Sequence, residues 1–347
     1  MKAAVLYGRE DVRVEQIEVP RLGPGEMLLR TRVALTCGTD VKVYRRGYHA
    51  RMIRPPAVFG HEVAGIVEEV GAGVETLLPG TRVVVANSAP CGQCPYCLMG
   101  SQSLCDDLEF WNGAYAEFVR IPARVVRHNV LPLEPGVALR QAAMVEPLAC
   151  VVRGVEDSGI REVQTVAVIG AGPIGLMLVC LARLRGARVI AVGRNAGRLD
   201  RARALGAAET VVAGEGVDLV GRLRELGPHG NGPDVVIEAV GLPETSEAAV
   251  RAVRKGGLVN LFAGCPTDAR IGIDAARLHY DELTVKSTFH HTPESIRKAL
   301  ALIAAGHVDP ADFITADATL DELPQVLRRL SRGADGLKTA ILTWGQE

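Results

Sequence analysis

Short alternating runs of apolar and polar residues fill the first third of the chain. The clearest runs are Met27–Val33, Glu62–Val70 and Arg82–Ala86, and turns such as Leu22-Gly-Pro-Gly and Leu78-Pro-Gly separate them. Alternation with a period of two is typical of half-buried β-strands, and Gly and Pro favour the turns between strands. The pattern therefore predicts a β-rich first part.

From about Val151 the pattern changes to strands that alternate with helices. An apolar strand at Val166–Ile169 precedes an apolar helix to about Arg185, and a second strand at Arg188–Val192 precedes a helix through Arg198–Leu205. Further apolar runs predict four more strands: Glu209–Val212, Val235–Ala239, Leu258–Phe262 and Leu283–Thr288. Such a βαβ series predicts a mostly parallel sheet with helices on both faces.

The last part of the chain changes pattern again. Pro293–Ala305 and Leu320–Leu330 have the periodicity of amphipathic helices, and Lys338–Leu342 has that of a final strand. The length of 347 residues exceeds what one hydrophobic core usually supports, so we expect two domains.

Composition and charge narrow the class of protein. Hydrophobic residues make up 48% of the chain and the formal net charge is −1, which suits a soluble globular protein. A near-neutral chain lacks the basic excess that binding to nucleic acid or to an acidic membrane surface requires. We therefore expect no nucleic acid and no membrane as partners.

The chain shows no predicted export or membrane segment. The N-terminal residues turn charged too soon for a signal peptide, and the apolar run Val163–Leu184 contains Gln164 and a Gly-Ala-Gly-Pro turn. That run suits a strand, a turn and a helix better than a membrane span. We expect a cytoplasmic protein whose thiols stay reduced, which favours metal ligation over disulfides.

Four of the eight cysteines fall within one short stretch. They are Cys91, Cys94, Cys97 and Cys105. Four thiolates at this spacing suit a tetrahedral site for one Zn²⁺, and the competing interpretation, an iron–sulfur cluster, fits the spacing less well.

A glycine-rich turn follows the strand at 166–169 and opens the next helix. It reads Gly170-Ala-Gly172-Pro173-Ile174-Gly175. The first glycine permits a tight turn, the second lets the backbone approach a pyrophosphate, and the third lets helix and strand pack closely. The helix N-terminus offers free N–H groups to the phosphates, so the turn predicts a dinucleotide site.

The end of the second strand carries information about the type of dinucleotide. Proteins that bind NAD usually have Asp or Glu there, which bonds the ribose 2′-hydroxyl. This chain has Gly193-Arg194-Asn195 instead, with Arg198 nearby. A guanidinium favours a 2′-phosphate, so the residues indicate a preference for NADP(H). The alternative is a surface arginine at a site that accepts both cofactors.

Two separate loops of the β-rich part offer a second set of metal ligands. Cys37-Gly-Thr39-Asp40 supplies a thiolate, and Gly60-His61-Glu62 supplies an imidazole and a carboxylate. Catalytic zinc is bound by three protein ligands of this kind and keeps one open position.

With these motifs together, the chain closely resembles the zinc-containing medium-chain dehydrogenase/reductase family. The pattern Gly60-His-Glu-x-x-Gly65-x5-Gly71-x-x-Val74 is similar to the zinc signature of the family. The Cys37 loop, the four-cysteine stretch and the glycine-rich turn are similar to its catalytic loop, structural-zinc lobe and nucleotide fingerprint. They occur in family order over essentially the whole chain.

The resemblance implies roles for individual residues. Cys37 and His61 would bind catalytic zinc, Glu62 would be a permanent or exchangeable ligand, and Asp40 would orient His61. Glu146, in the sequence Glu146-Pro-Leu, stands where alcohol dehydrogenases have a cysteine but polyol and threonine dehydrogenases have a glutamate. We expect Glu146 to be a direct or water-mediated ligand.

Further roles follow for the proton path. Thr39 would start the proton relay. Relatives commonly have histidine where this chain has Lys42, so the exit of the proton is an open point.

The resemblance also places cofactor and substrate contacts. Besides the glycine-rich turn and residues 193–198, the residues expected to touch the cofactor are Ala239, Val240, Phe262, Ala263, Thr288 and Phe289. Phe110, Trp111 and His290 are expected to face the substrate, although a histidine at a strand end is as often an ordinary turn residue.

The expected architecture is a GroES-like catalytic domain and a Rossmann nucleotide-binding domain with a cleft between them. The first comprises residues 1–150 and 289–347 and includes a structural-zinc lobe at about 88–108; the second comprises residues 151–288. The fold class is α/β, with a doubly wound parallel sheet in the Rossmann domain. Relatives form dimers or tetramers, so we expect a homo-oligomer.

The resemblance implies a zinc- and NAD(P)-dependent dehydrogenase, with NADP preferred, that oxidises a secondary alcohol of a polyol or sugar-like substrate. Two zinc ions are expected per chain, one catalytic and one structural. One alternative is oxidation of an amino alcohol, as by L-threonine 3-dehydrogenase. Another is a non-catalytic NADP-binding sensor on the same fold, which the complete ligand sets argue against.

Overall fold

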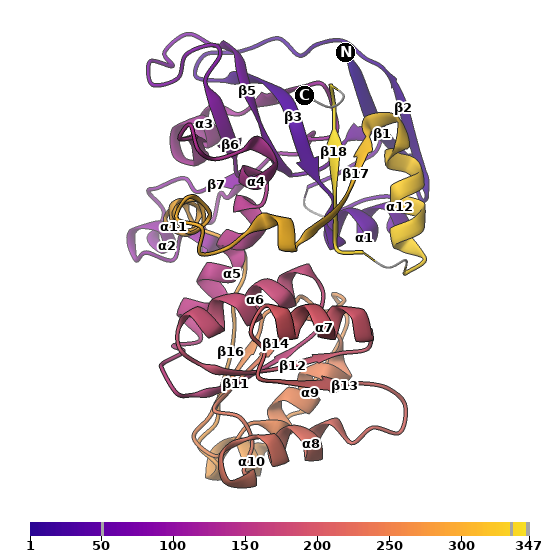
Figure 1. Ribbon diagram of the computed structural model, residues 1–347. Coiled ribbons are helices and arrows are strands. Elements are labelled where there is room, and N and C mark those ends of the chain that lie inside the picture. The colour runs from indigo at the N-terminus through magenta and orange to yellow at the C-terminus, as the bar shows by residue number, and fades with distance from the viewer. Residues whose placement is uncertain (50–51, 334–335, 345–347) are drawn as a thin grey trace. The chain divides into compact units, whose positions relative to one another are not determined.

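The computed structural model describes residues 1–49, 52–333 and 336–344 (Figure 1). They form two compact units. The first comprises Met1–Ala149 with His291–Glu347, and the second comprises Cys150–His290.

The first unit is built on β-sheets. Its described strands form a three-stranded sheet in the order β2-β1-β4, a two-stranded sheet β7-β8, and a seven-stranded sheet in the order β10-β6-β5-β3-β18-β17, in which β9 also pairs with β3. The bounds are β1 Lys2–Gly8, β2 Asp11–Gln16, β3 Met27–Leu35, β4 Ala57–Val58, β5 Glu62–Val70, β6 Arg82–Val85, β7 Ser88–Ala89, β8 Glu109–Phe110, β9 Phe118–Ile121, β10 Val130–Pro132, β17 Ile314–Thr319 and β18 Lys338–Leu342.

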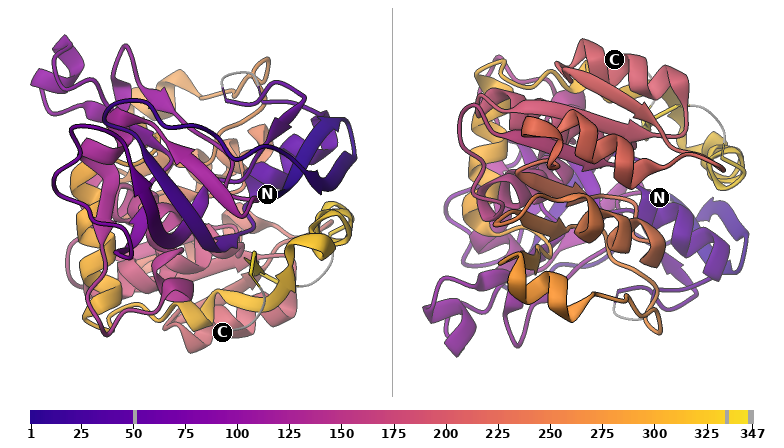
Figure 2. Two further views of the ribbon diagram at one scale, coloured as in Figure 1. Left: turned by 90° about the horizontal axis from the view of Figure 1, so that it is seen from above. Right: turned by 90° about the horizontal axis from the view of Figure 1, so that it is seen from below.

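The first unit also contains helices. Their bounds are α1 Gly38–Arg46, α2 Pro95–Leu98, α3 Ala123–Asn129, α4 Leu139–Ala142, α11 Pro293–Ala304 and α12 Leu323–Ser331, and α5 Val145–Asp157 continues into the second unit. The four-cysteine segment around α2 projects from the edge of the first unit in both views of Figure 2.

Long-range strand pairing assembles the first unit. Strand β3 pairs antiparallel with β5, which sets Leu35 opposite Glu62, and its other edge pairs with β18, which sets Leu35 opposite Ala340. The last strand of the chain, β18, thereby lies between β3 from the first part of the chain and β17 (Figure 1). Among the largest fully buried side chains are Phe59 and Tyr115, whose rings pack edge to face with centroids 5.1 Å apart.

The second unit contains a six-stranded parallel sheet in the order β13-β12-β11-β14-β15-β16. The bounds are β11 Thr165–Ile169, β12 Arg188–Gly193, β13 Glu209–Val212, β14 Val235–Glu238, β15 Leu258–Leu261 and β16 Thr284–Ser287. Helices α6 Pro173–Leu184 and α7 Ala196–Ala204 cover one face, and α8 Leu219–Leu226, α9 Pro243–Ala252 and α10 Ala275–Tyr280 cover the other (Figure 1).

Burial explains why these short apolar runs are strands. Every residue of β11 is buried, as are all four residues of β14. Strands covered on both faces by helices have continuous apolar sequences in place of alternating ones. The predicted parallel sheet is confirmed, and the observed strands lie within two residues of the predicted bounds.

Two features of the helices differ from the prediction. The segment expected as one helix from Leu320 begins as a 3₁₀ turn at Leu320–Glu322, and the α-helix starts only at Leu323. Pro324 explains this, because proline is tolerated in the first turn of a helix but not in its interior. In addition, α1 follows Cys37 where the sequence pattern predicted no helix.

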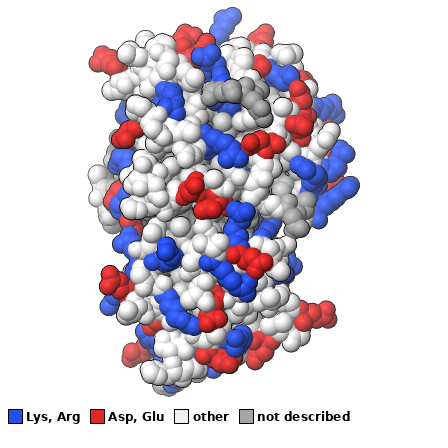
Figure 3. All heavy atoms as spheres, in the orientation of Figure 1, with Lys and Arg blue, Asp and Glu red and all other residues white. Residues whose placement is uncertain are grey.

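Two properties of the surface and the helices bear on the expected partners. On the face shown in Figure 3, positive and negative side chains are intermixed. Within the described ranges, no helix is both long and apolar enough to cross a membrane.

Candidate zinc and dinucleotide sites

Cys37 and Asp40 are held by the start of helix α1. Cys37 is the N-cap residue: its Sγ accepts a hydrogen bond from the N–H of Thr39 at 3.5 Å, and Asp40 Oδ2 accepts one from the N–H of Cys37 at 2.8 Å. This reciprocal capping satisfies N–H groups that a helix start leaves without partners. It also fixes the thiol and the carboxylate relative to each other.

The imidazole of His61 is oriented by Asp40. His61 Nδ1 lies 3.4 Å from Asp40 Oδ1, and the hydroxyl of Tyr115 donates to Asp40 Oδ2 at 2.7 Å. Burial lowers the pKa of His61, but the negative charge and hydrogen bond of Asp40 outweigh it and raise that pKa well above its usual value. With Nδ1 directed at a carboxylate, Nε2 is the nitrogen left for a metal.

Three of the four predicted ligands of catalytic zinc come together, and Glu146 is not part of this group. The ligand atoms of Cys37, His61 and Glu62 lie within 4.8 Å of one another. Cys37 ends the loop after β3 and Glu62 begins β5, and these two strands pair. The register of one strand pair thus joins two motifs that stand apart in the sequence.

Glu62 has a partner that the sequence motifs did not reveal. The ammonium of Lys338 donates to both carboxylate oxygens, at 2.6 and 2.5 Å, and to the carbonyl of Thr36 at 3.1 Å. Glu62 is 0% exposed and Lys338 is 2% exposed. Burial disfavours the ammonium, but the Glu62 carboxylate outweighs that effect and raises the pKa of Lys338. Glu62 would therefore reach a metal only by sharing or leaving this ion pair.

Glu146 lies in the first turn of α5 and is buried. Burial raises its pKa to about 7; His61 opposes the shift and Glu62 adds to it. His291 Nε2 lies 3.8 Å from Glu146 Oε1 and 2.9 Å from Asn87 Oδ1. His291 is buried, and both of these contacts are with polar groups of the first unit.

The donor set fits zinc. A thiolate, an imidazole with a carboxylate behind it, and additional carboxylates are the ligand types that catalytic zinc sites use. Because a carboxylate is harder than a thiolate, a set that contains Glu146 binds zinc less tightly than one with a second cysteine.

The other residues predicted near this site differ in accessibility. Thr39 is half-buried on α1 and Lys42, one turn later, is exposed. Phe110 is half-buried in β8. Trp111 is 5% exposed, and its indole N–H donates to the carbonyl of Ala86 at 2.7 Å, so it is part of the hydrophobic core. A substrate would reach little of the Trp111 ring.

The four clustered cysteines form a compact group of sulfur atoms. All four Sγ atoms lie within 4.8 Å of one another, and each of the eight cysteines of the chain is free of disulfides. Backbone N–H groups of Asp106 and Cys97 lower the pKa of Cys94 to about 6. The N–H of Cys91 donates to the sulfur of Cys105 at 3.2 Å. Four sulfur atoms this close together, with backbone N–H groups donating to them, fit a closed tetrahedral zinc site.

The glycine-rich turn of the second unit has the geometry that the motif predicts. A Cβ on Gly175 would collide with the carbonyl oxygen of Gly170, so only glycine lets α6 pack on the turn. A Cβ on Gly193 would lie 2.7 Å from the Cβ of Ala171, so the end of β12 must also be small. Gly172 is the N-cap of α6, Pro173 is at its first position, and both Pro173 and Ile174 are half-buried.

Arg194 and Asn195, which follow β12, have different environments. The side chain of Arg194 is exposed. Asn195 is the N-cap of α7, and its Oδ1 accepts a hydrogen bond from the N–H of Arg198 at 2.9 Å. The amide of Asn195 is thus used by the helix, whereas Arg194 faces solvent.

The remaining predicted cofactor residues follow the carboxyl ends of β14, β15 and β16. Ala239, Phe262 and Ala263 are half-buried, and Val240 is 39% exposed. Thr288 is buried and its hydroxyl donates to Asp157 Oδ2 at 2.9 Å. Phe289 is 47% exposed and stacks on His290. Ligands of open parallel sheets bind at this edge, outside the carboxyl ends of the strands.

Two family profiles match the chain. Residues 23–132 match the alcohol dehydrogenase GroES-like domain, and residues 173–305 match the zinc-binding dehydrogenase domain. D-xylulose reductase A of Aspergillus niger is 30% identical to the chain, over 97% of the chain and 95% of that protein. The chain belongs to the zinc-binding alcohol dehydrogenase family.

Further similarities agree with this assignment. Sorbitol dehydrogenase of Bacillus subtilis (strain 168) is 27% identical, over 95% of the chain and 93% of that protein. The solved structure of a protein described as a zinc-binding dehydrogenase from Sinorhizobium meliloti 1021, bound to NADP, is 32% identical, covers 99% of both chains and has a TM-score of 0.89. The predicted family and fold class are confirmed, and the protein is an oxidoreductase.

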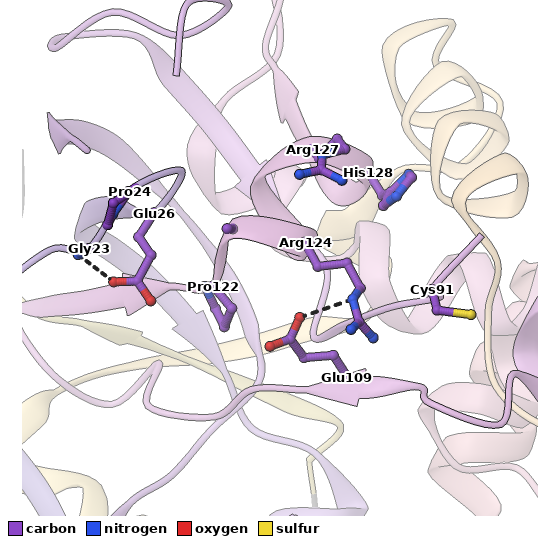
Figure 4. A pocket seen from close by; sticks show the side chains of 10 residues that line it. Gly23, Pro24, Glu26, Cys91, Glu109, Pro122, Arg124, Arg127 and His128 are labelled. Carbon is purple, nitrogen blue, oxygen red and sulfur yellow. Dashed lines mark hydrogen bonds and ion pairs between the residues drawn. The ribbon is translucent and has the colours of Figure 1, made fainter. Parts of the chain in front are cut away.

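A polar cavity of about 500 Å³ lies elsewhere in the first unit of this zinc-binding dehydrogenase. Figure 4 shows Arg124 directed at Glu109 and places Arg127 beside His128 on α3. Arg124 also pairs with Asp107 at 2.7 Å, and Glu26 accepts a hydrogen bond from Gly23. Glu109 and Arg124 are therefore paired with each other, Glu26 has a backbone partner, and we assign the cavity no ligand.

Several residues of the site gave no signal in the sequence. Lys338, Tyr115, His291 and Asn87 all contact a predicted zinc ligand or its partner, but none belongs to a motif. Tyr115 is 75 positions from Asp40, and Lys338 is 276 positions from Glu62. The folded first unit brings them together, through loops as well as through strand β18.

Proposed function

We propose that this oxidoreductase transfers a hydride between NAD(P), with NADP preferred, and a secondary alcohol or ketone of a polyol or sugar-like substrate, with the help of zinc. The observation that carries the proposal is the group formed by Cys37, His61 and Glu62. Glu146, a carboxylate where alcohol dehydrogenases have a second cysteine, would join it. The named activities of the relatives, D-xylulose reductase and sorbitol dehydrogenase, support a polyol substrate.

Each residue of the site in the first unit has its own proposed role. Cys37 and His61 would hold the catalytic zinc, Glu146 would complete the site directly or through water, and Glu62 would serve as an exchangeable ligand. Bound zinc would supply Lewis acidity toward the alcohol oxygen, and the nicotinamide would accept the hydride. Asp40 fixes the tautomer of His61. The Thr39 hydroxyl would take the proton of the substrate alcohol while it passes its own proton on to water or to the nicotinamide ribose.

The preference for NADP rests on the end of β12. No acidic residue is present at Gly193-Arg194-Asn195 to bond a ribose 2′-hydroxyl, and the exposed Arg194 offers a fork of donors to a 2′-phosphate. The relative from S. meliloti, which is bound to NADP, supports this choice.

Two further features belong to the proposal. The four-cysteine segment would hold a second, structural zinc. The chain would also form a homodimer or homotetramer, and β16, an edge strand of the parallel sheet, presents backbone N–H and C=O groups that a second copy could pair.

A steady-state assay of the zinc-loaded protein with polyols, ketoses and amino alcohols, each with NADP(H) and NAD(H), tests the function. We expect polyols and ketoses to be the best substrates and NADP(H) the better cofactor. Arg194→Ala should remove the cofactor preference, whereas Arg203→Ala, a control in the helix that follows Arg194, should retain it. Markedly faster rates with NAD would contradict the NADP assignment, and turnover only of amino alcohols would contradict the polyol assignment.

A further inference from the structure

A buried carboxylate that neither zinc site uses lies at the cofactor edge of the parallel sheet. Glu238 is the last residue of β14 and is 0% exposed. In the described part of the chain, no Lys, Arg or His forms an ion pair with it; its partners are neutral donors. Burial of a carboxylate is costly unless hydrogen bonds compensate for the lost water.

The partners of the Glu238 carboxylate are in the loop that follows its own strand and in the first turn of α9. Oε1 accepts hydrogen bonds from the N–H of Val240 at 2.8 Å, from the N–H of Gly241 at 3.0 Å and from the hydroxyl of Thr245 at 2.8 Å. Oε2 accepts a second, longer bond from Gly241 at 3.2 Å. The Glu238 carboxylate therefore holds the backbone of Val240 and Gly241 in place through their N–H groups.

The main chain of Glu238 organises the neighbouring loop as well. Its carbonyl accepts hydrogen bonds from the N–H groups of Phe262 at 2.9 Å and of Ala263 at 3.0 Å, directly after β15. One residue thus connects the two loops that hold four of the predicted cofactor contacts.

The loop fixed by Glu238 lies against the glycine-rich turn. A Cβ on Gly170 would lie 3.0 Å from Val240 Cγ2 and 3.1 Å from the carbonyl of Ala239, so the two segments are in close contact. The strand order reverses direction between β11 and β14, and β11 leads into the glycine-rich turn. Ligands bind at this switch point in open α/β sheets.

We propose that Glu238 is a positioning residue for the dinucleotide: its buried carboxylate holds the Val240–Gly241 backbone against the glycine-rich turn and so shapes the wall on which the cofactor lies. The inference rests on the proposed function only in that a dinucleotide must bind. It explains why a carboxylate is kept at a strand end where an apolar side chain would be easier to bury.

The test compares three variants of the full-length, zinc-loaded protein by the Kd for NADPH, the kinetics and the melting temperature. Glu238→Leu leaves the N–H groups of Val240 and Gly241 without their acceptor, so we expect binding of NADPH about tenfold weaker or more. The KM for the cofactor should rise, with kcat at saturating cofactor and the KM for the alcohol little changed. Glu238→Gln should stay within about threefold of the parent, because its Oε1 can accept the same three bonds.

Glu244→Leu, at an exposed acid in the first turn of α9, is the matched control and should bind like the parent. If Glu238→Leu does not fold, Thr245→Val tests the inference instead, because it removes one hydrogen-bond donor from the same carboxylate. We expect Thr245→Val to bind NADPH about threefold more weakly at an unchanged melting temperature. If Glu238→Leu binds NADPH as tightly as the parent, the inference is overturned while the proposed function stays intact. The same holds for Thr245→Val if Glu238→Leu does not fold. A parent protein that binds no dinucleotide would overturn the proposed function itself.

Discussion

The Lys338–Glu62 pair shows what a single residue contributes to the zinc site. Glu62 belongs to a recognisable motif, but its charge is balanced by an ammonium 276 positions away in the last strand. A carboxylate buried without that ammonium would take up a proton or draw in water. Lys338 therefore keeps Glu62 ionised within reach of Cys37 and His61.

Replacement of Lys338 tests this balance. Lys338→Met should lower the free energy of unfolding by about 3–5 kcal/mol, because it leaves Glu62 buried without a partner. Unfolding in urea measures the loss. The double variant Lys338→Met/Glu62→Gln should recover most of it, and a Lys338→Met protein as stable as the parent would show that the pair is not needed.

The raised pKa of Glu146 makes zinc binding depend on pH. Burial places this pKa at about 7, and the pKa of His61 is also raised, so the metal-free site carries protons that zinc must displace. The affinity for zinc should therefore rise from about pH 6 to about pH 8, as measured by competition with a chelator. Glu146→Gln should bind zinc more weakly and with a shallower dependence on pH. Equal affinity of the parent at both pH values would contradict this explanation.

At the scale of elements, the second unit could be predicted closely. Glu209–Val212 has the predicted bounds, as does Lys338–Leu342 in the first unit. Buried parallel strands are short, continuous apolar runs between turns and helices, so their sequence alone defines them. The order of strands in a sheet depends on contacts between distant segments and could not be predicted in this way.

Helix α1 could not be predicted because its signals are unusual. Its N-cap is Cys37, whereas Ser, Thr, Asp and Asn are the usual cap residues. The helix is nine residues long and carries two exposed arginines in its last turn. The capping contacts of the Cys37 loop therefore define where α1 begins, and the sequence pattern of the helix itself gives little indication of it.

Asn195 provides a test at the same scale, because it caps α7 and follows the predicted NADP residue. Asn195→Ala should lower the free energy of unfolding by about 1 kcal/mol through loss of the cap. Asn195→Asp should keep the stability but weaken the binding of NADPH relative to NADH, because a carboxylate repels the 2′-phosphate. Thermal unfolding and the two Kd values measure these effects. An alanine variant as stable as the parent would contradict the capping role.

At the scale of the whole molecule, the motifs predicted which residues would act but not what holds them. Cys37, His61 and Glu62 were recognisable, and the pairing of β3 with β5 brings them together. Tyr115, His291 and Lys338 were not recognisable, because each meets its partner through long-range packing of the first unit. Residues that orient ligands depend on the complete fold, whereas ligands depend on the metal and leave a pattern in the sequence.

The zinc content per chain is the measurement that tests the central claim most directly. The claim is that Cys37, His61 and Glu146 form a catalytic zinc site separate from the four-cysteine site. Metal analysis of the purified protein should find two zinc ions per chain in the parent and one in Cys37→Ser. A parent with a single zinc ion that Cys37→Ser retains would contradict the claim.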